Sequence, residues 1–323
     1  LDNIYLSKVR NNMPRVLSLY DSDITSTTYG AGDRFYWGWK LIDFGNATFQ
    51  GAANGLSRLL ANEMFPLNLN PQKILSRIDD IFIGTKSLTN KNGSLQEAFP
   101  NEGSYCVTAL VAYDLIVAIE NLKATIPNEL LNKYKSIVSP LIEYVMSSDE
   151  HHAFISNHLA TAAAALIKWN KLTGDNTHAK GTSIVDRIFD KQSNEGWFLE
   201  YEGADPGYQT LCINYLADIY ISSKELDFLD KIDKSINFLL HCTHPDGSFG
   251  GIYGSRNTRF YYPGGIEYFA DKLKSAKCLA DYMALSISEN KTVNLDAIDE
   301  PNLIPMFNSY CFAAENCKKR DIN

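Results

Sequence analysis

The 323-residue sequence lacks several features that define whole classes of protein. No apolar run is long enough to indicate a segment that crosses a bilayer, so we expect no membrane span. Basic residues are outnumbered, since 30 Lys and Arg stand against 38 Asp and Glu and give a formal net charge of −8. Nucleic-acid binding requires a basic face, and we therefore expect no nucleic-acid partner.

Cysteine pairs at metal-binding spacing are also missing. The six cysteines are far apart and none belongs to a CxxC pair, which argues against a zinc site or a disulfide scaffold. His151 and His152 are adjacent, but no third ligand follows at helical spacing. We predict neither a metal nor another cofactor. The chain starts at Leu1 without methionine and no signal-like segment follows, so both a cytoplasmic and an exported protein fit the sequence.

Strand patterns are scarce, because alternation of apolar and polar residues never extends beyond a few positions. Helical patterns are long by comparison. Residues 128–146 carry an apolar stripe opposite a charged face, which predicts a half-exposed helix. Residues 107–119 and 159–167 are apolar nearly all round, which predicts buried helices.

Glycine turns precede the most apolar helices. Gly93, Gly196 and Gly247 lie in similar turns, and their intervals correspond to a repeat of roughly 50 residues, the length of a helical hairpin. We therefore predict an all-α fold in which inner and outer helices alternate, an (α/α) toroid of five or six hairpins. It is expected to form a single domain over residues 1–323, with a short irregular C-terminal segment at about 290–323 that consists of a short terminal helix and a tail.

A toroid brings the loops before its inner helices to one mouth, where polar residues far apart in sequence are expected to meet. Aromatic rings beside carboxylates, amides and arginines suit carbohydrates, because rings stack on sugar faces and polar groups bind hydroxyls or carboxylates. On this basis the residues expected to bind substrate are Trp37, Trp39, Glu102, Trp197, Glu202, Asp205, Tyr253, Arg256, Asn257 and Glu267.

Two of these loops resemble a known enzyme family. Asn157-His158 opens an alanine-rich helix, and Asp205-Pro206 with Tyr208 stands directly before another helix. Both segments are similar to motifs at the toroid mouth of heparinase II/III-like and alginate polysaccharide lyases. The resemblance implies that Asn157 neutralises a uronate carboxylate, that His158 assists and that Tyr208 transfers the proton.

The activity implied by this resemblance is a lyase that cleaves a uronate-containing polysaccharide by β-elimination, with an acidic polysaccharide as its partner. The proton next to a carboxylate is weakly acidic, and groups that neutralise the carboxylate stabilise the charge that develops as the proton leaves. A purely structural alternative is that Ser156 or Asn157 caps the following helix and that Tyr208 packs at a turn.

Two other functions fit the same sequence. A glycoside hydrolase or a sugar epimerase on this fold would use paired carboxylates, which in hydrolases lie roughly 5–10 Å apart. The candidate carboxylates are Glu97, Glu102, Glu200, Glu202, Asp205 and Glu267. A toroid that binds glycans without catalysis would need only the aromatic platforms.

Overall fold

The computed structural model describes residues 3–32, 46–66, 68–97 and 102–317. In these ranges the secondary structure is helical, and extended residues are joined by isolated β-bridges rather than strands. The elements in chain order are α1 (Ile4–Leu17), the 3-10 helix η1 (Ala47–Gly51), α3 (Ala52–Ala61), α4 (Pro71–Leu88), α5 (Tyr105–Leu122), α6 (Asn128–Ser147), α7 (Ser156–Thr173), α8 (His178–Asp190), α9 (Pro206–Ser222), α10 (Leu229–Leu240), α11 (Gly264–Phe269), α12 (Lys274–Ser288) and α13 (Glu300–Cys317).

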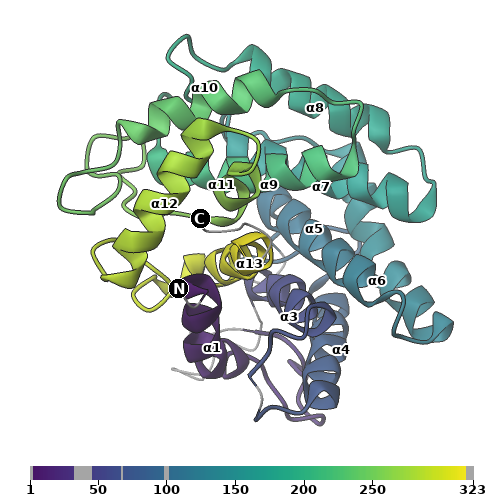
Figure 1. Cartoon of the computed structure of the whole chain (residues 1–323). Helices are drawn as coiled ribbons and strands as arrows, with labels where there is room; N and C mark the ends of the chain where they lie inside the picture. Colours follow the sequence, from purple (N-terminus) through teal and green to yellow (C-terminus); the bar gives the residue numbers. More distant parts are fainter. Residues whose placement is uncertain (1–2, 33–45, 67, 98–101, 318–323) are drawn as a thin grey trace.

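Two concentric rings of helices make up the fold (Figure 1). The inner ring consists of α3, α5, α7, α9, α11 and α13, in which each helix packs against the next and α13 packs against α3. The outer ring consists of α4, α6, α8, α10, α12 and α1. The chain therefore has the all-α, (α/α) toroid fold that its sequence predicts, and the described helices close the ring.

The inner helices are buried because their sequences are apolar on every side. On α7 every residue from 159 to 169 is buried, whereas the buried residues of the outer helix α8 are Gly181, Ile184, Val185 and Ile188. Among the described residues one helix, α5, is long and apolar enough to cross a membrane by length and composition, contrary to the expectation that no apolar run reaches this length. It is nevertheless a core helix, since 78% of that segment is buried inside the protein.

The glycine turns share one backbone conformation. Gly93, Gly196 and Gly247 are left-handed, with φ of 85°, 106° and 91°. A Cβ atom at Gly93 would lie 2.2 Å from the carbonyl oxygen of Pro140 on α6, and one at Gly196 would lie 2.3 Å from that of Lys234 on α10. Glycine is required at both turns for its backbone freedom and for the close approach to an outer helix.

The C-terminal segment differs from the expectation. Instead of a short terminal helix and a tail, the described residues contain the 18-residue helix α13, buried throughout residues 303–314. It packs against α1, α3 and α11 and so completes the inner ring. The length of the helix was underestimated because residues 303–314 are buried on every side, which leaves little amphipathic period, and because Pro305 lies inside the helix.

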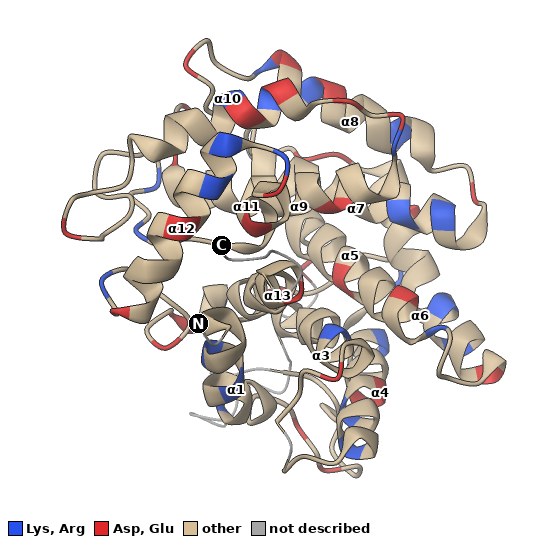
Figure 2. Ribbon diagram, in the orientation of Figure 1, with Lys and Arg blue, Asp and Glu red and all other residues tan. Residues whose placement is uncertain are grey.

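The two ends of the inner ring are distinct, and we call them the amino mouth, where the inner helices begin, and the carboxyl mouth, where they end. Most charged residues belong to the outer helices and the connecting loops (Figure 2). The inner helices carry few charges, and five of these lie toward the carboxyl mouth: Arg58, Glu120, Lys168, Asp218 and Glu315.

Candidate active site at the amino mouth

The loops that lead into α7, α9 and α11 are joined to one another at the amino mouth. Ile155 and Glu200 form an antiparallel β-bridge between the first two loops. The N–H of Ser255, before α11, donates to the carbonyl of Ala204, before α9, at 2.8 Å. Loop residues from three hairpins are thereby held in one place.

Glu200 is a fully buried carboxylate in this cluster. Its oxygens accept the backbone N–H and the side-chain amide of Asn157, each at 2.9 Å. Burial raises the pKa of Glu200 to about 7, because the bonds from Asn157 and the nearby charge of His158 oppose only part of the rise. At neutral pH the carboxyl group is therefore close to its titration midpoint.

The same bonds explain how α7 begins. Its N-cap residue, Ile155, supplies no side-chain hydrogen bond, and the hydroxyl of Ser156 donates to the carbonyl of Leu199 at 2.7 Å. The interpretation that Ser156 or Asn157 caps this helix is therefore wrong. Glu200, on the next loop, accepts the Asn157 N–H and supplies an acceptor at the positive end of the helix dipole.

His158 forms an ion pair beside this carboxylate. Its Nδ1 lies 2.7 Å from Oε2 of Glu150, and its ring also interacts with Cys106 at the start of α5. Burial alone would lower the His158 pKa, but Cys106 and Glu150 raise it well above its usual value. Burial has the largest single effect on Glu150 and acts to raise its pKa, but the hydrogen bonds and charges of His158 and His152 together outweigh burial and lower the pKa. His158 is thus held as an imidazolium, a fixed positive charge at the mouth.

Tyr208, in the first turn of α9, lies beneath an arginine. The guanidinium carbon of Arg256 is 4.2 Å from the centroid of the Tyr208 ring and 5.1 Å from that of Tyr201. Burial raises the pKa of Tyr208 to about 12, against the opposing effect of the Arg256 charge. The arginines whose ion pairs are found within the described residues are Arg15, Arg58, Arg77 and Arg187. The charge of Arg256 is therefore not neutralised by a described carboxylate.

Asp205 holds the backbone of Tyr208 and of Arg256 in place through hydrogen bonds. It is fully buried and caps α9, accepting the N–H of Tyr208 at 3.2 Å through Oδ1. Its Oδ2 accepts the N–H of Arg256 at 3.0 Å, and Thr258 also donates to the carboxylate. Its oxygens are occupied by protein donors, so Asp205 positions Tyr208 and Arg256 rather than presenting itself to a ligand.

Several residues expected at the mouth lie elsewhere on the chain. Glu267 is buried on α11 and accepts a hydrogen bond from the hydroxyl of Tyr5 on the outer helix α1 at 2.8 Å, so it faces away from the mouth. Trp197 is half-buried, with its indole N–H donating to Glu195 at 3.0 Å in the turn after α8. Trp37 and Trp39 lie outside the described residues.

The remaining expected residues are on loop surfaces. Glu202 is exposed on the turn that follows Glu200, and Asn257 is exposed with a left-handed backbone, φ 55°. Tyr253 is 59% exposed, and its hydroxyl lies 3.2 Å from Nε2 of His244. Glu102 is half-buried before α5, and its carbonyl accepts a hydrogen bond from the side chain of Asn90 at 2.7 Å.

Two members of the cluster had no counterpart in the sequence-based prediction, namely Glu150 and Cys106. Glu150 carries a weak signal, because it belongs to the same loop as His158, but loop carboxylates are common and spacing does not select it. Cys106 gives no signal at all, since its neighbours on the mouth come from other hairpins. Over the described ranges, no group of three or more His, Cys, Asp or Glu side chains is placed to hold a metal ion.

No family model and no curated protein matches the sequence. Solved structures do match it. A sugar epimerase from a ruminal bacterium has a TM-score of 0.65 at 12% identity, covering 98% of this chain and 100% of that one. A glycosyl hydrolase of family 88 from Bacteroides vulgatus has a TM-score of 0.61 at 10% identity, covering 98% of both chains. A polysaccharide lyase has a TM-score of 0.58 at 10% identity, covering 96% and 99%. The chain thus shares its α/α toroid fold with carbohydrate-active enzymes of three different chemistries.

Proposed function

We propose that this protein is a polysaccharide lyase that cleaves a uronate-containing chain by β-elimination at the amino mouth. The observation that carries the proposal is the Arg256 guanidinium, which lies 4.2 Å from the ring of Tyr208 without a described carboxylate partner. An arginine whose charge is not neutralised by a protein carboxylate is suited to bind a carboxylate of the substrate in bidentate fashion. Its neighbour, Tyr208, is a proton-transfer group of the kind that elimination requires.

The proposed step begins with the uronate carboxylate on Arg256, while the positive charge of His158 lies nearby. Together these charges stabilise the enolate-like density that develops when the proton next to the carboxylate leaves. The ionised oxygen of Tyr208 takes that proton, the electron pair becomes a carbon–carbon double bond, and the bond to the 4-linked sugar oxygen breaks. Tyr208 then returns the proton to the leaving oxygen.

Asn157 has an indirect part in this scheme. It is 4% exposed, and both its backbone N–H and its amide bind Glu200. We therefore assign it to positioning α7, and with it His158, rather than to direct contact with the uronate. This differs from the role that the resemblance to heparinase II/III-like lyases implies, and membership of that family remains part of the proposal.

Hydrolysis is the second candidate, and it is favoured by one observation. Glu200 has a pKa of about 7, a value suited to a general acid at neutral pH. Because Glu200 is fully buried and both of its oxygens accept hydrogen bonds from Asn157, this role requires that the bond to the Asn157 amide opens to admit the substrate. The two candidates predict opposite pH profiles. A tyrosinate base whose pKa is about 12 gives a rate that rises with pH through the neutral and alkaline range. A general acid at Glu200 gives a rate that falls above pH 7.

The first experiment is ultraviolet absorbance during incubation with a panel of uronate-containing polysaccharides. β-Elimination leaves a conjugated double bond at the new non-reducing end, so the lyase proposal expects absorbance to rise with at least one polymer. New reducing ends without this absorbance would favour hydrolysis. Saturable glycan binding with no product would favour a non-catalytic role.

A matched pair of variants then tests whether the Arg256 guanidinium over Tyr208 binds the substrate. Arg256→Gln removes the guanidinium over Tyr208, whereas Arg259→Gln removes a nearby arginine of the same loop that lines a separate hollow with Tyr253. We expect Arg256→Gln to lower kcat/KM on the uronate substrate by about a hundredfold, the loss of one strong charge-assisted contact. Arg259→Gln is expected to change it little. Equal effects of the two substitutions would contradict the proposal.

A further inference from the structure

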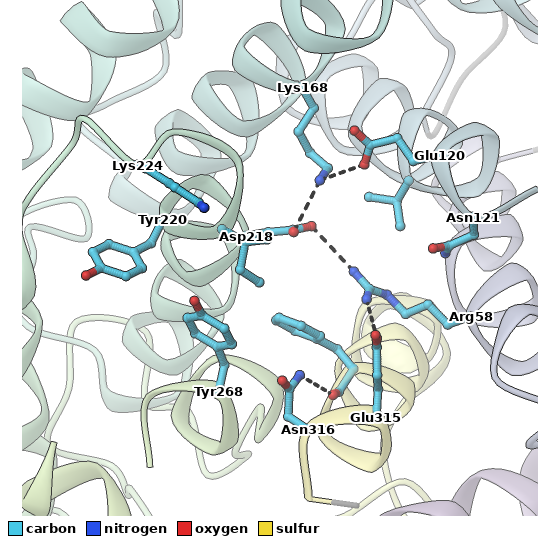
Figure 3. Close-up of a pocket in the computed structure, with 13 residues that line it drawn as sticks. Arg58, Glu120, Asn121, Lys168, Asp218, Tyr220, Lys224, Tyr268, Glu315 and Asn316 are labelled. Carbon is cyan, nitrogen blue, oxygen red and sulfur yellow. Dashed lines mark hydrogen bonds and ion pairs between the residues drawn. The ribbon is translucent and has the colours of Figure 1, made fainter. Parts of the chain in front are cut away.

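A cavity lies at the carboxyl mouth, on the far side of the inner ring from the proposed active site. Its volume is about 660 Å³, and its lining comes from the ends of the inner helices (Figure 3). Lys168 follows His158 by ten residues on α7, and Asp218 follows Tyr208 by ten residues on α9. At 1.5 Å per residue, each pair is separated by about 15 Å along its helix. The cavity is therefore distinct from the amino mouth.

One wall of this cavity is a buried network of charges. Asp218 accepts the hydroxyl of Tyr113 at 2.6 Å, Lys168 at 3.2 Å and Arg58 at 3.4 Å. Lys168 also binds Glu120 at 2.8 Å, and Arg58 binds Glu315 at 2.7 Å. The side chains of Arg58, Lys168 and Asp218 are 8%, 5% and 5% exposed. Each buried charge faces an opposite one, so the wall is polar, rigid and close to neutral.

The opposite wall is aromatic. Tyr268 stacks with Phe312, with ring centroids 6.2 Å apart and an interplanar angle of 20°. Tyr220 lies 6.5 Å from Tyr268 at 61°. Figure 3 shows Tyr220 and Tyr268 on one side of the cavity and Lys168, Glu120 and Asn121 on the other. Both tyrosines are half-buried and belong to the lining of the cavity. Lys272, which is not part of that lining, covers one face of the Tyr268 ring, with its Nζ 4.0 Å from the ring centroid.

The charge of the lining indicates what kind of molecule fits. The basic side chains at the cavity are Arg58, Lys168 and Lys224, and the acidic ones are Glu120, Asp218 and Glu315. The two sets balance. Lys224 is exposed beyond the end of α9 and takes no part in the buried network, whereas the other five charges are paired with one another. A ligand with a net charge would disturb the paired groups, whereas a neutral ligand with many hydroxyls would hydrogen-bond to their outer edges and to the amides of Asn121 and Asn316.

We propose that the carboxyl-mouth cavity binds a neutral sugar unit, a monosaccharide or disaccharide without a carboxylate. A pyranose has an apolar face of C–H groups and an edge of hydroxyls, and the cavity offers an aromatic wall opposite a polar wall. Its volume lies in the range of small-molecule sites. The proposal does not depend on the reaction at the amino mouth.

The test is a titration of the full-length protein with cellobiose, maltose and mannobiose, with glucuronic acid as the charged comparator, followed by calorimetry. We expect saturable binding of at least one neutral disaccharide and weaker or no binding of glucuronic acid. Tyr268→Ala is expected to weaken that binding by about tenfold, the contribution of one stacked ring, whereas Tyr268→Phe keeps it. Arg256→Gln, at the other mouth, is expected to leave this binding unchanged.

Hydrogen–deuterium exchange gives a readout that requires no variant. The bound sugar is expected to slow exchange in peptides that cover residues 217–224 and 312–317, and not in those that cover residues 196–205. Protection at the amino mouth alone, or the absence of saturable binding by every neutral probe, would overturn the proposal. Binding at the carboxyl mouth by a protein without lyase activity would leave this proposal standing while the proposed function fails.

Discussion

Glu200 and Asp218 stand at opposite ends of the same helix, one just before α9 and the other near its end, and both are almost completely enclosed. Burial by itself acts to raise the pKa of both carboxyl groups. At Glu200 this effect prevails, because its direct hydrogen-bond donors are the neutral amide groups of Asn157. At Asp218 the charges of Lys168 and Arg58 outweigh burial and lower the pKa.

The difference teaches that burial alone does not define a reactive group. At the carboxyl mouth the buried charges are matched to one another, so they stabilise the ring and define a wall. At the amino mouth Glu200 is left near its titration midpoint, and Arg256 is unmatched among the described residues. The same scaffold pairs its buried charges at one end, and at the other end it leaves the charge of Arg256 without a described carboxylate partner, which is the feature that the proposed function uses.

The largest expected effect is a loss of folding stability when the buried ion-pair network at the carboxyl mouth is broken. Asp218→Asn removes the shared partner of Arg58 and Lys168, and we expect it to lower the free energy of unfolding by about 3–5 kcal/mol. The control is Asp281→Asn, which removes the partner of Lys277 in an exposed pair on α12 and is expected to cost at most about 0.5 kcal/mol. Urea denaturation of both variants measures the contrast, and similar losses would contradict it.

The next effect concerns pH. The native pKa of Glu200 is about 7, above its ordinary value of 4.5, so the native state binds this proton more tightly than the unfolded state does. The stability from this proton is complete below pH 4.5 and is lost as pH rises to 7, by about 3 kcal/mol in total. Glu200→Gln is expected to flatten the stability curve across this window.

Unfolding measured at several pH values tests that expectation, with Glu202→Gln as the exposed control on the same turn. Asp114, buried on α5 with a pKa raised to about 8, contributes a slope of the same sign and remains in every variant. The difference between wild type and Glu200→Gln therefore isolates Glu200. An unchanged difference from pH 4.5 to 7 would show that the carboxyl group titrates normally in the fold.

The effect that corresponds to the smallest change in free energy is a loss of turnover in a variant of Tyr208. Tyr208→Phe removes the proposed proton-transfer oxygen and keeps the ring beneath Arg256, so we expect kcat to fall by about a hundredfold or more. Thermal stability is expected to stay nearly constant, because the ring contact with Phe260 remains. Tyr201→Phe, on the other ring under Arg256, is the control and is expected to retain activity. Turnover of Tyr208→Phe at the wild-type rate would remove Tyr208 from the mechanism.

The sequence predicted features that depend on local pattern. The left-handed glycines 93, 196 and 247 and the buried helices α5 and α7 follow from residue type and periodicity, and together they imply the toroid. Contacts between hairpins are a different matter. Asn157 and Glu200 are 43 positions apart, and nothing in either segment signals their bond.

The direction in which a side chain faces around its helix was equally impossible to predict from the sequence. Glu267 occupies a segment that suggested a loop site, yet its side chain faces Tyr5, 262 positions away on the outer ring. The length of the ring-closing helix α13 was underestimated, because a helix that is buried on every side over residues 303–314 has little amphipathic period to detect. Pairing across the toroid is set by packing in three dimensions, and a single sequence carries no record of it.

The closing helix also governs when this protein is able to fold. Because α13 packs against α3 and α1, the barrel joins residues more than two hundred positions apart, and the side chain of Asn3 donates to the carbonyl of Ala314 at 2.8 Å. During synthesis the apolar faces of the first hairpins stay uncovered until α13 has left the ribosome. Such long-range closure makes folding slow and leaves the nascent chain prone to aggregation. We therefore expect early hairpins to need a chaperone until α13 arrives.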